Sequence, residues 1–372
     1  MRRLIAAVLL LFACLGAPRI AAPPVLAQPA APAQPAAAAR PVALPHFGAD
    51  ADGISVSGLS SGGFMAMQYA VAFSKSTIGA GIVAGGPYGC AAFGAPLAGG
   101  PRAVVRAGEC MRGQNVEAQH FLDLVKQYRK LGLIDSPANV ARQRIYLFHG
   151  GADAVVSSAT MEATRALYRL LRVPASRLAY VGDIKAGHAF LSDDLGDDCA
   201  AQPAVPFISR CPVAGVPYDQ PRAILEHVLG RRLNARATSL SSSPLPFDQR
   251  AFAPDGSGFS DTGYLFVPAD CRAARARCAV HVVFHGCLQG AANPAVGNRV
   301  YDRLGFNEWA DTNRLIVLYP QVTVSRGNPM GCWDWWGYDG KMQGLRQTFP
   351  TRIGTQIAAV HAMVAELAKP AN

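Results

Sequence analysis

The stretch ISVSGLSSGGFMAMQYAVAF, residues 54–73, joins a short apolar strand pattern to a buried helix pattern through a glycine-rich turn. Within it, Gly58-Leu59-Ser60-Ser61-Gly62 is a G-x-S-x-G sequence. The strand–turn–helix context is that of a nucleophile elbow, which exposes its serine above a sheet. We therefore expect Ser60 to be a nucleophile at a helix N-terminus, where free N–H groups favour negative charge. An ordinary Gly/Ser turn is the alternative.

Strand and helix patterns alternate along the rest of the chain. Strands are expected at residues 54–57, 78–84, 144–148, 178–181, 280–284 and 315–319, and helices at 64–73, 159–171, 223–229, 302–313 and 353–367. Continuous apolar strands alternating with helices are typical of a mostly parallel sheet covered on both faces. The predicted fold class is therefore α/β.

A serine nucleophile needs a base held by a carboxylate. His188 lies in the loop KAGHAF just after a strand pattern, and Asp153 follows the strand pattern RIYLF through HGGA. The order Ser60, Asp153, His188 is that of the α/β-hydrolases. Three other acids are rival candidates that end no strong strand: Asp183, Asp193 and Asp194.

A second oxyanion donor is expected from a turn that stands in an unusual place. His285-Gly286-Cys287 follows the strongest strand pattern, VHVVF, and such a turn normally precedes the elbow. Here it follows all three proposed triad residues, which indicates a circularly permuted α/β-hydrolase. The backbone N–H groups of Ser61 and Cys287 would form the oxyanion hole, and His285 is expected to be structural.

The N-terminus reads as export and linker sequence. Residues 1–27 have a basic start, a short apolar run and small residues for cleavage, as in a signal peptide. A lipoprotein signal with Cys14 lipidated is an alternative. Residues 28–45 form an Ala/Pro-rich linker. Residues 46–372 are expected to form a single catalytic domain without a separate polymer-binding domain, and no segment beyond the signal is long and apolar enough to span a membrane.

Eight cysteines remain after the expected cleavage, and an even number in an exported chain favours disulfides. No C-x-x-C pair is present, so we expect no metal site. Proximity pairs Cys90–Cys110, Cys199–Cys211 and Cys271–Cys278, and exclusion leaves Cys287–Cys332. The sequence alone leaves this connectivity open.

The formal net charge is +10, but the arginines are scattered and no nucleic-acid motif occurs, so we expect no nucleic-acid partner. Gly331-Cys332-Trp333-Asp334-Trp335-Trp336 gathers three of the four tryptophans. Such rings offer rigid apolar contact area. We expect Trp333 and Trp335 to contact substrate, with a packed core corner as the alternative.

The motifs GLSSGGFMAMQYAVAFS, AGGPYGC, HGGAD, GHAF, HVVFHGCLQ, WADTNRLIVLYPQ and NPMGCWDWWG occur in this order. Together they resemble the extracellular and periplasmic poly(3-hydroxybutyrate) depolymerases with a permuted catalytic domain, from about Asp52 to Glu366. The resemblance implies the triad and oxyanion hole given above, Trp333 in the substrate crevice, and no cofactor. It also implies a secreted or periplasmic enzyme acting on a polyester or oligomeric ester, and we expect a monomer. A feruloyl or acetyl esterase acting on plant-wall esters and a non-catalytic polymer-binding protein are the alternatives.

Overall fold

The computed structural model describes residues 40–93, 100–201, 204–273, 275–343 and 346–371. The expected signal peptide and most of the expected linker lie outside these residues. The remaining linker residues already belong to the domain. Val42 donates its N–H to Pro246 and accepts from Asp248, and Leu44 is buried. The domain therefore begins before residue 46, because the backbone of Val42 bonds the domain and the Leu44 side chain packs in its core.

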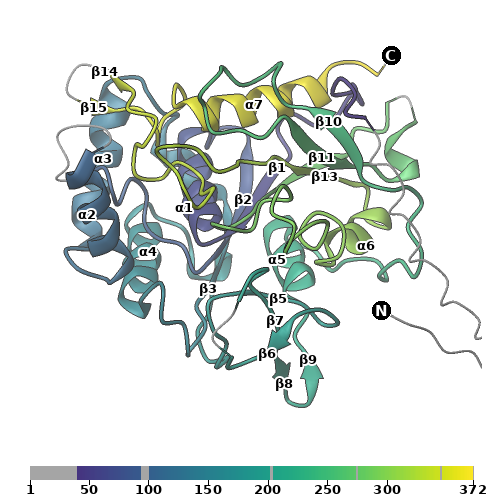
Figure 1. The fold of residues 1–372 in the computed structure, drawn as a ribbon, viewed down its shortest axis with the longest axis horizontal. Helices are drawn as coiled ribbons and strands as arrows, with labels where there is room; N and C mark the ends of the chain where they lie inside the picture. The colour runs from purple at the N-terminus through teal and green to yellow at the C-terminus, as the bar shows by residue number, and fades with distance from the viewer. Residues whose placement is uncertain (1–39, 94–99, 202–203, 274, 344–345, 372) are drawn as a thin grey trace, which may run out of the picture. The chain divides into compact units, whose positions relative to one another are not determined.

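An eight-stranded sheet forms the centre of the domain, in the order β10-β11-β13-β12-β1-β2-β3-β4 (Figure 1). Its strands are β1 (Ile54–Leu59), β2 (Thr77–Val83), β3 (Arg144–Phe148), β4 (Leu178–Val181), β10 (Leu245–Asp248), β11 (Thr262–Phe266), β12 (Ala279–Phe284) and β13 (Leu315–Tyr319). Neighbours from β13 to β4 are parallel, and β11 is antiparallel to β13 and β10. The predicted mostly parallel sheet is confirmed.

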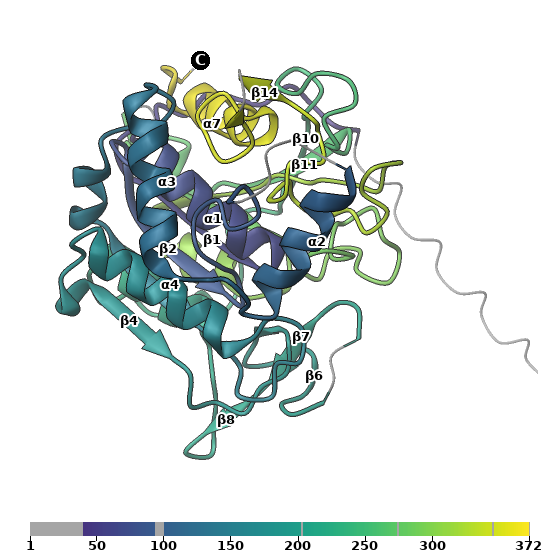
Figure 2. The same ribbon diagram turned by 90° about the vertical axis from the view of Figure 1, so that its left-hand side faces the viewer.

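Helices cover both faces of this sheet. One hydrophobic cluster joins the sheet to α1 (Ser61–Ala72), α3 (Ala118–Lys130), α4 (Ser158–Leu170) and α7 (Thr355–Ala368), and the other joins it to α5 (Gln220–Leu229) and α6 (Phe306–Asp311). Alternate residues of β3 serve the two clusters: Ile145 and Leu147 face one, and Tyr146 and Phe148 the other. Figure 2, turned by a quarter, shows α3 and α4 side by side near β4.

The strand order confirms the circular permutation. If β10 to β13 are renumbered as strands 1 to 4 and β1 to β4 as strands 5 to 8, the order across the sheet becomes 1-2-4-3-5-6-7-8. The turn after β12 then follows the third strand and precedes the elbow, as in an unpermuted α/β-hydrolase. The permutation leaves the strand neighbours unchanged, so the elbow and this turn meet at β1 and β12, which pair directly.

Several elements differ from the sequence expectation. The helix expected at 302–313 is only α6, because Gly305 adopts a positive φ of 109° at its start. Helices α2 (Gly100–Met111) and α3 and strands β10 and β11 were not predicted. Each of these helices is strongly amphipathic and each of these strands lies near the sheet edge, so none shows a continuous apolar run.

Several short strands form small sheets separate from the central one. β5 (Phe190–Leu191), β6 (Asp197–Asp198) and β7 (Ile208–Arg210) form one small sheet, and β8 (Pro212–Val213) with β9 (Val216–Pro217) and β14 (Met342–Gln343) with β15 (Arg346–Gln347) form two hairpins. The first two groups lie together at the bottom of Figure 1. Among the described residues, no helix is long and apolar enough to cross a bilayer.

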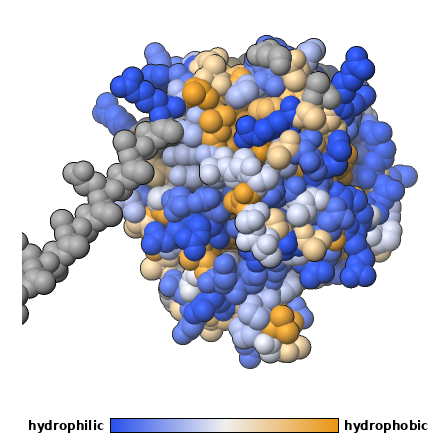
Figure 3. Space-filling view, turned by 90° about the vertical axis from the view of Figure 1, so that its right-hand side faces the viewer, coloured by the Kyte–Doolittle hydropathy of each residue, from blue (hydrophilic) through white to orange (hydrophobic). Residues whose placement is uncertain are grey.

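Four disulfides tie the loops: Cys90–Cys110, Cys199–Cys211, Cys271–Cys278 and Cys287–Cys332. The face in Figure 3 is largely hydrophilic, with hydrophobic residues in small separate patches. A larger apolar surface lies beside α2 and the tryptophan-rich loop.

Candidate active site

Ser60 sits in a strained turn between β1 and α1. Its φ of 57° and ψ of −121° lie outside the regions that a serine normally adopts. The Ser60 N–H donates to Val83 O at 2.9 Å, which ties the turn to β2. A Cβ on Gly58 would lie 2.3 Å from the Gly62 oxygen, and one on Gly62 would lie 2.2 Å from Phe284 O. Both motif glycines are therefore required for the turn to pack against β12.

His188 and Asp153 form a buried pair. His188 Nδ1 lies 2.9 Å from Asp153 Oδ2, and the two side chains are 6% and 0% exposed. Asp153 Oδ1 accepts the N–H groups of Val155 and Val156 at 2.8 and 3.0 Å. Burial raises the pKa of Asp153, but the hydrogen bond and charge of His188, helped by these N–H groups, outweigh it and hold the pKa below its usual value. An ionised Asp153 fixes the imidazole with its proton on Nδ1.

The loops that carry this pair are packed on one another. Ala152 N donates to Ala186 O at 2.9 Å, and a Cβ on Gly150 would lie 2.2 Å from the same oxygen. The Gly187 N–H donates to Cys199 O at 3.0 Å, so the Cys199–Cys211 bridge supports the histidine loop. This packing explains why the HGGAD and GHAF motifs are both glycine-rich.

The rival acids lie elsewhere. Asp183 is exposed, Asp193 pairs with Arg236, and Asp194 accepts the hydroxyl of Ser192. Asp153 is thus the carboxylate that the structure brings to His188.

Two backbone N–H groups are available for an oxyanion. In the described part of the chain, neither Ser61 N nor Cys287 N donates to a protein acceptor. Gly286 lies opposite Ser60, since a Cβ built on it would be 3.6 Å from Ser60 Cβ. The Cys287–Cys332 disulfide holds this turn against the tryptophan-rich loop. The Ser61 hydroxyl accepts Trp333 N at 3.3 Å, which ties the loop to the elbow as well.

A chain of contacts links the histidine side of the site to the oxyanion turn. The His188 ring meets the Phe207 ring edge-on, with centroids 6.4 Å apart. Gln289 Nε2 donates to Pro206 O at 2.7 Å, and Gln289 Oε1 accepts Gly286 N at 2.7 Å. Segments that are far apart in the sequence therefore converge at the carboxyl ends of β1, β3, β4 and β12. Sequence reasoning missed Gln289, although it closes the HGCLQ motif.

The expectation for Trp333 is wrong. Its side chain is 0% exposed and packs edge-on against Phe284 and Phe259, with ring centroids 4.9 and 5.7 Å away. The indole fills the core beneath the loop, so it cannot contact substrate. Trp335 does border open space, although its ring is largely covered by stacking on Phe64 at 3.9 Å.

An apolar crevice of about 590 Å³ lies beside the oxyanion turn. Trp335, Trp336 and Met330 line one part, and α2 lines another with Val104 and Val105. The two valines are 61% and 59% exposed, which is unusual for adjacent apolar residues on a helix. Cys287 and Cys332 also line the crevice, so it reaches the proposed oxyanion hole. Sequence reasoning missed α2, for which the amphipathic pattern of residues 100–111 was the available signal.

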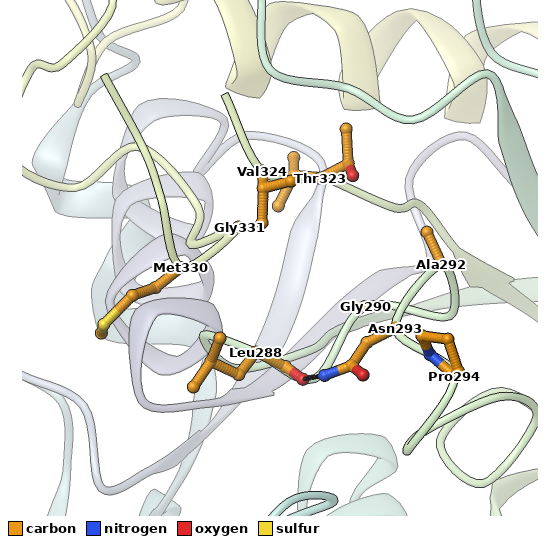
Figure 4. A pocket seen from close by; sticks show the side chains of 10 residues that line it. Leu288, Gly290, Ala292, Asn293, Pro294, Thr323, Val324, Met330 and Gly331 are labelled. Carbon is orange, nitrogen blue, oxygen red and sulfur yellow. Dashed lines mark hydrogen bonds between the residues drawn. The ribbon is translucent and has the colours of Figure 1, made fainter. Parts of the chain in front are cut away.

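A smaller cavity of about 260 Å³ adjoins the same turn (Figure 4). Leu288 and Met330 border it at one end, and Ala292, Asn293 and Pro294 at the other, as the close-up shows. Met330 lines both cavities, and Asn293 Nδ2 donates to Leu288 O at 2.8 Å. Among the described residues, no group of three or more His, Cys, Asp or Glu side chains could hold a metal ion.

The fold and the strained serine elbow define the class of protein: a circularly permuted α/β-hydrolase. No family model matches the chain. The chain is 38% identical over 329 residues to a poly(3-hydroxybutyrate) depolymerase of Delftia acidovorans, covering 87% of this chain and 61% of that protein. It is 35% identical over 316 residues to a polyhydroxybutyrate depolymerase of Talaromyces funiculosus, covering 80% of this chain and 86% of that protein.

Solved structures agree with these relatives. A PHB depolymerase from Penicillium funiculosum superposes with a TM-score of 0.75, and a serine-to-alanine PHB depolymerase variant complexed with an R3HB trimer superposes with 0.74. Each is 33% identical, and each match covers 88% of this chain and 99% of the other. The chain therefore belongs to the polyhydroxybutyrate depolymerase family, whose members are carboxylic ester hydrolases.

Proposed function

We propose that this protein hydrolyses the ester bonds of poly(3-hydroxybutyrate) or its oligomers through an acyl-enzyme on Ser60. The observation that carries the proposal is the buried Asp153–His188 pair in the same fold as the strained Ser60 elbow, and an apolar crevice that reaches Cys287 supports it. The relative seen with an R3HB trimer supports the choice of polyester.

In the proposed mechanism each group has one task. Ser60 Oγ attacks the ester carbonyl, and His188 takes the hydroxyl proton on Nε2, because Nδ1 is held by Asp153. The Ser61 and Cys287 N–H groups receive the negative charge that develops on the carbonyl oxygen. His188 then gives the proton to the leaving alcohol, and a water molecule repeats the sequence to release the acid and free Ser60.

The crevice explains why a polyester suits this site. Its walls are aliphatic and aromatic, formed by valine, methionine and tryptophan side chains. A hydroxybutyrate chain exposes methyl and methylene groups between its esters, so burying it there removes apolar surface from water.

We further propose that the protein is a monomer that works outside the cytoplasm, in the periplasm or after secretion. Four disulfides support an oxidising compartment. Sedimentation of the mature protein, and fractionation of producing cells, would test these two statements.

The experiment compares wild type with Ser60→Ala on amorphous polyhydroxybutyrate, with ferulate release from an aryl ester as a parallel assay. Wild type should clear the polymer and Ser60→Ala should not. Ser74→Ala is the control, since Ser74 is a buried serine whose hydroxyl bonds Ser136 O. Clearing by Ser60→Ala would refute the mechanism, and preferential release of ferulate would refute the substrate. Failure of wild type to react with a fluorophosphonate probe would favour a non-catalytic binding protein.

A further inference from the structure

We propose that His285 and Gln289 are positioning residues that clamp Gly286 from both sides and so aim the Cys287 N–H at the oxyanion. This inference rests on the proposed ester hydrolysis. It concerns two buried polar side chains that the triad mechanism does not use.

The first half of the clamp is His285. Its Nε2 lies 3.1 Å from the backbone nitrogen of Val322, and an N–H can only donate, so Nε2 is the acceptor. Nδ1 therefore carries the proton and donates to Gly286 O at 2.7 Å. The ring is fully buried, and burial lowers the pKa of His285 to about 4 despite the opposing bond to Gly286, so the ring stays neutral in this one tautomer.

The consequence of this bond lies on the other side of the peptide. In a trans peptide the C=O and the N–H point in opposite directions. Fixing the Gly286 carbonyl toward His285 therefore turns the N–H of Cys287 away from His285. That N–H is one of the two proposed oxyanion donors, and Gly286 faces Ser60.

The second half of the clamp is Gln289. Its Oε1 accepts Gly286 N at 2.7 Å, which fixes the peptide preceding Gly286. Its Nε2 donates to Pro206 O at 2.7 Å, and the next residue, Phe207, packs against the His188 ring. Gln289 thus ties the oxyanion turn to the loop that supports the catalytic histidine. Side chains therefore bond both peptide planes that flank Gly286, and the backbone N–H of Gln289 also donates to Gly286 O, at 3.2 Å.

Placement of this kind matters because oxyanion stabilisation depends on preorganised donors. Loss of one donor costs about 10²–10³ in turnover, and a misplacement of about 1 Å can cost about 10². The Cys287–Cys332 disulfide anchors the turn through the Cys287 side chain. The His285 ring adds its hydrogen bond to Gly286 O, which the longer Gln289 N–H bond shares, and so fixes the direction of the Gly286–Cys287 peptide.

The test compares His285→Leu, which removes the donor, with His285→Asn, whose amide can replace Nδ1–H. His285→Leu should lower kcat on a soluble p-nitrophenyl ester about 10- to 100-fold, with KM changed less than about threefold. His285→Leu should also raise the inhibition constant of a trifluoromethyl ketone by a similar factor, because this inhibitor forms a tetrahedral adduct. His285→Asn should recover most of both losses. His281→Leu is the matched control, because His281 is as fully buried as His285 but lies within β12 and bonds Ser55 and Ser57.

Gln289→Leu supplies an independent arm if His285→Leu does not fold. It should lower kcat about tenfold, whereas Gln143→Leu, which loses a buried bond to Ala70 O, should not. The double variant His285→Leu/Gln289→Leu should lose less than the product of the single losses, because both side chains act on one peptide.

Several results would overturn the clamp. One is a fall in kcat in the His285 and Gln289 variants that is no larger than in the His281 and Gln143 controls. Another is a change in KM alone. The third is a double variant whose fall in kcat equals the product of the two single falls. The proposed function fails separately, if wild type hydrolyses no ester at all.

Discussion

Replacing Asp153 by asparagine should reverse the proton arrangement of the His188 imidazole, the proposed general base. Asp153 Oδ1 accepts two backbone N–H groups, and Oδ2 faces His188 Nδ1. In Asp153→Asn the single remaining oxygen stays with the two N–H groups, because an NH₂ there would oppose two donors. The NH₂ group then faces His188 Nδ1 and makes that nitrogen an acceptor. The proton moves to Nε2, which can no longer accept from Ser60.

The expected loss is about 10⁴ in kcat, or about 5.5 kcal/mol at 1.36 kcal/mol per decade. Initial rates of p-nitrophenyl butyrate hydrolysis at pH 7, together with thermal unfolding, would measure it. The folded structure should survive, since the amide is isosteric with the carboxylate. Asp183→Asn is the control, because Asp183 is exposed, and it should keep full activity. Retention of more than a tenth of the wild-type rate by Asp153→Asn would refute the reasoning.

Three further outcomes follow from the structure. Burial lowers the pKa of His281 to about 3, below its usual 6.5, so the unfolded chain binds the proton first and stability falls as pH drops from 6.5. The free energy of unfolding, measured in urea, should fall between pH 8 and pH 5 by about 2 kcal/mol less in His281→Leu than in wild type. Replacing Cys287 and Cys332 by serine opens a 45-residue loop, which should lower the free energy of unfolding in chemical denaturation by about 4 kcal/mol and should also lower kcat. Opening the 7-residue Cys271–Cys278 loop in the same way should leave kcat unchanged. Trp336→Ala should raise KM for soluble hydroxybutyrate oligomers about tenfold with little change in kcat, because Trp336 lines the crevice; an unchanged KM would place the oligomer elsewhere.

The sequence was informative where the chemistry is local. The elbow could be read from residues 54–73 because its strand, its glycines and its helix are contiguous, and β3, β4 and β13 were located to the residue. The permutation was also readable, since the order of motifs along the chain is itself a sequence property. Helix α2 was missed because its apolar stripe belongs partly to the crevice rather than to the core.

The sequence by itself determined which residues carry reactive groups and the order in which strands and helices follow one another, because periodicity and turn chemistry act over a few residues. Only the tertiary structure decided which tryptophan is core and which borders the crevice, since Trp333 and Trp335 have the same local pattern but different neighbours. It also decided that Asp153 meets His188, and that Gln289 reaches Pro206. Those pairings depend on how β1, β3, β4 and β12 align their ends, which no short stretch of sequence encodes.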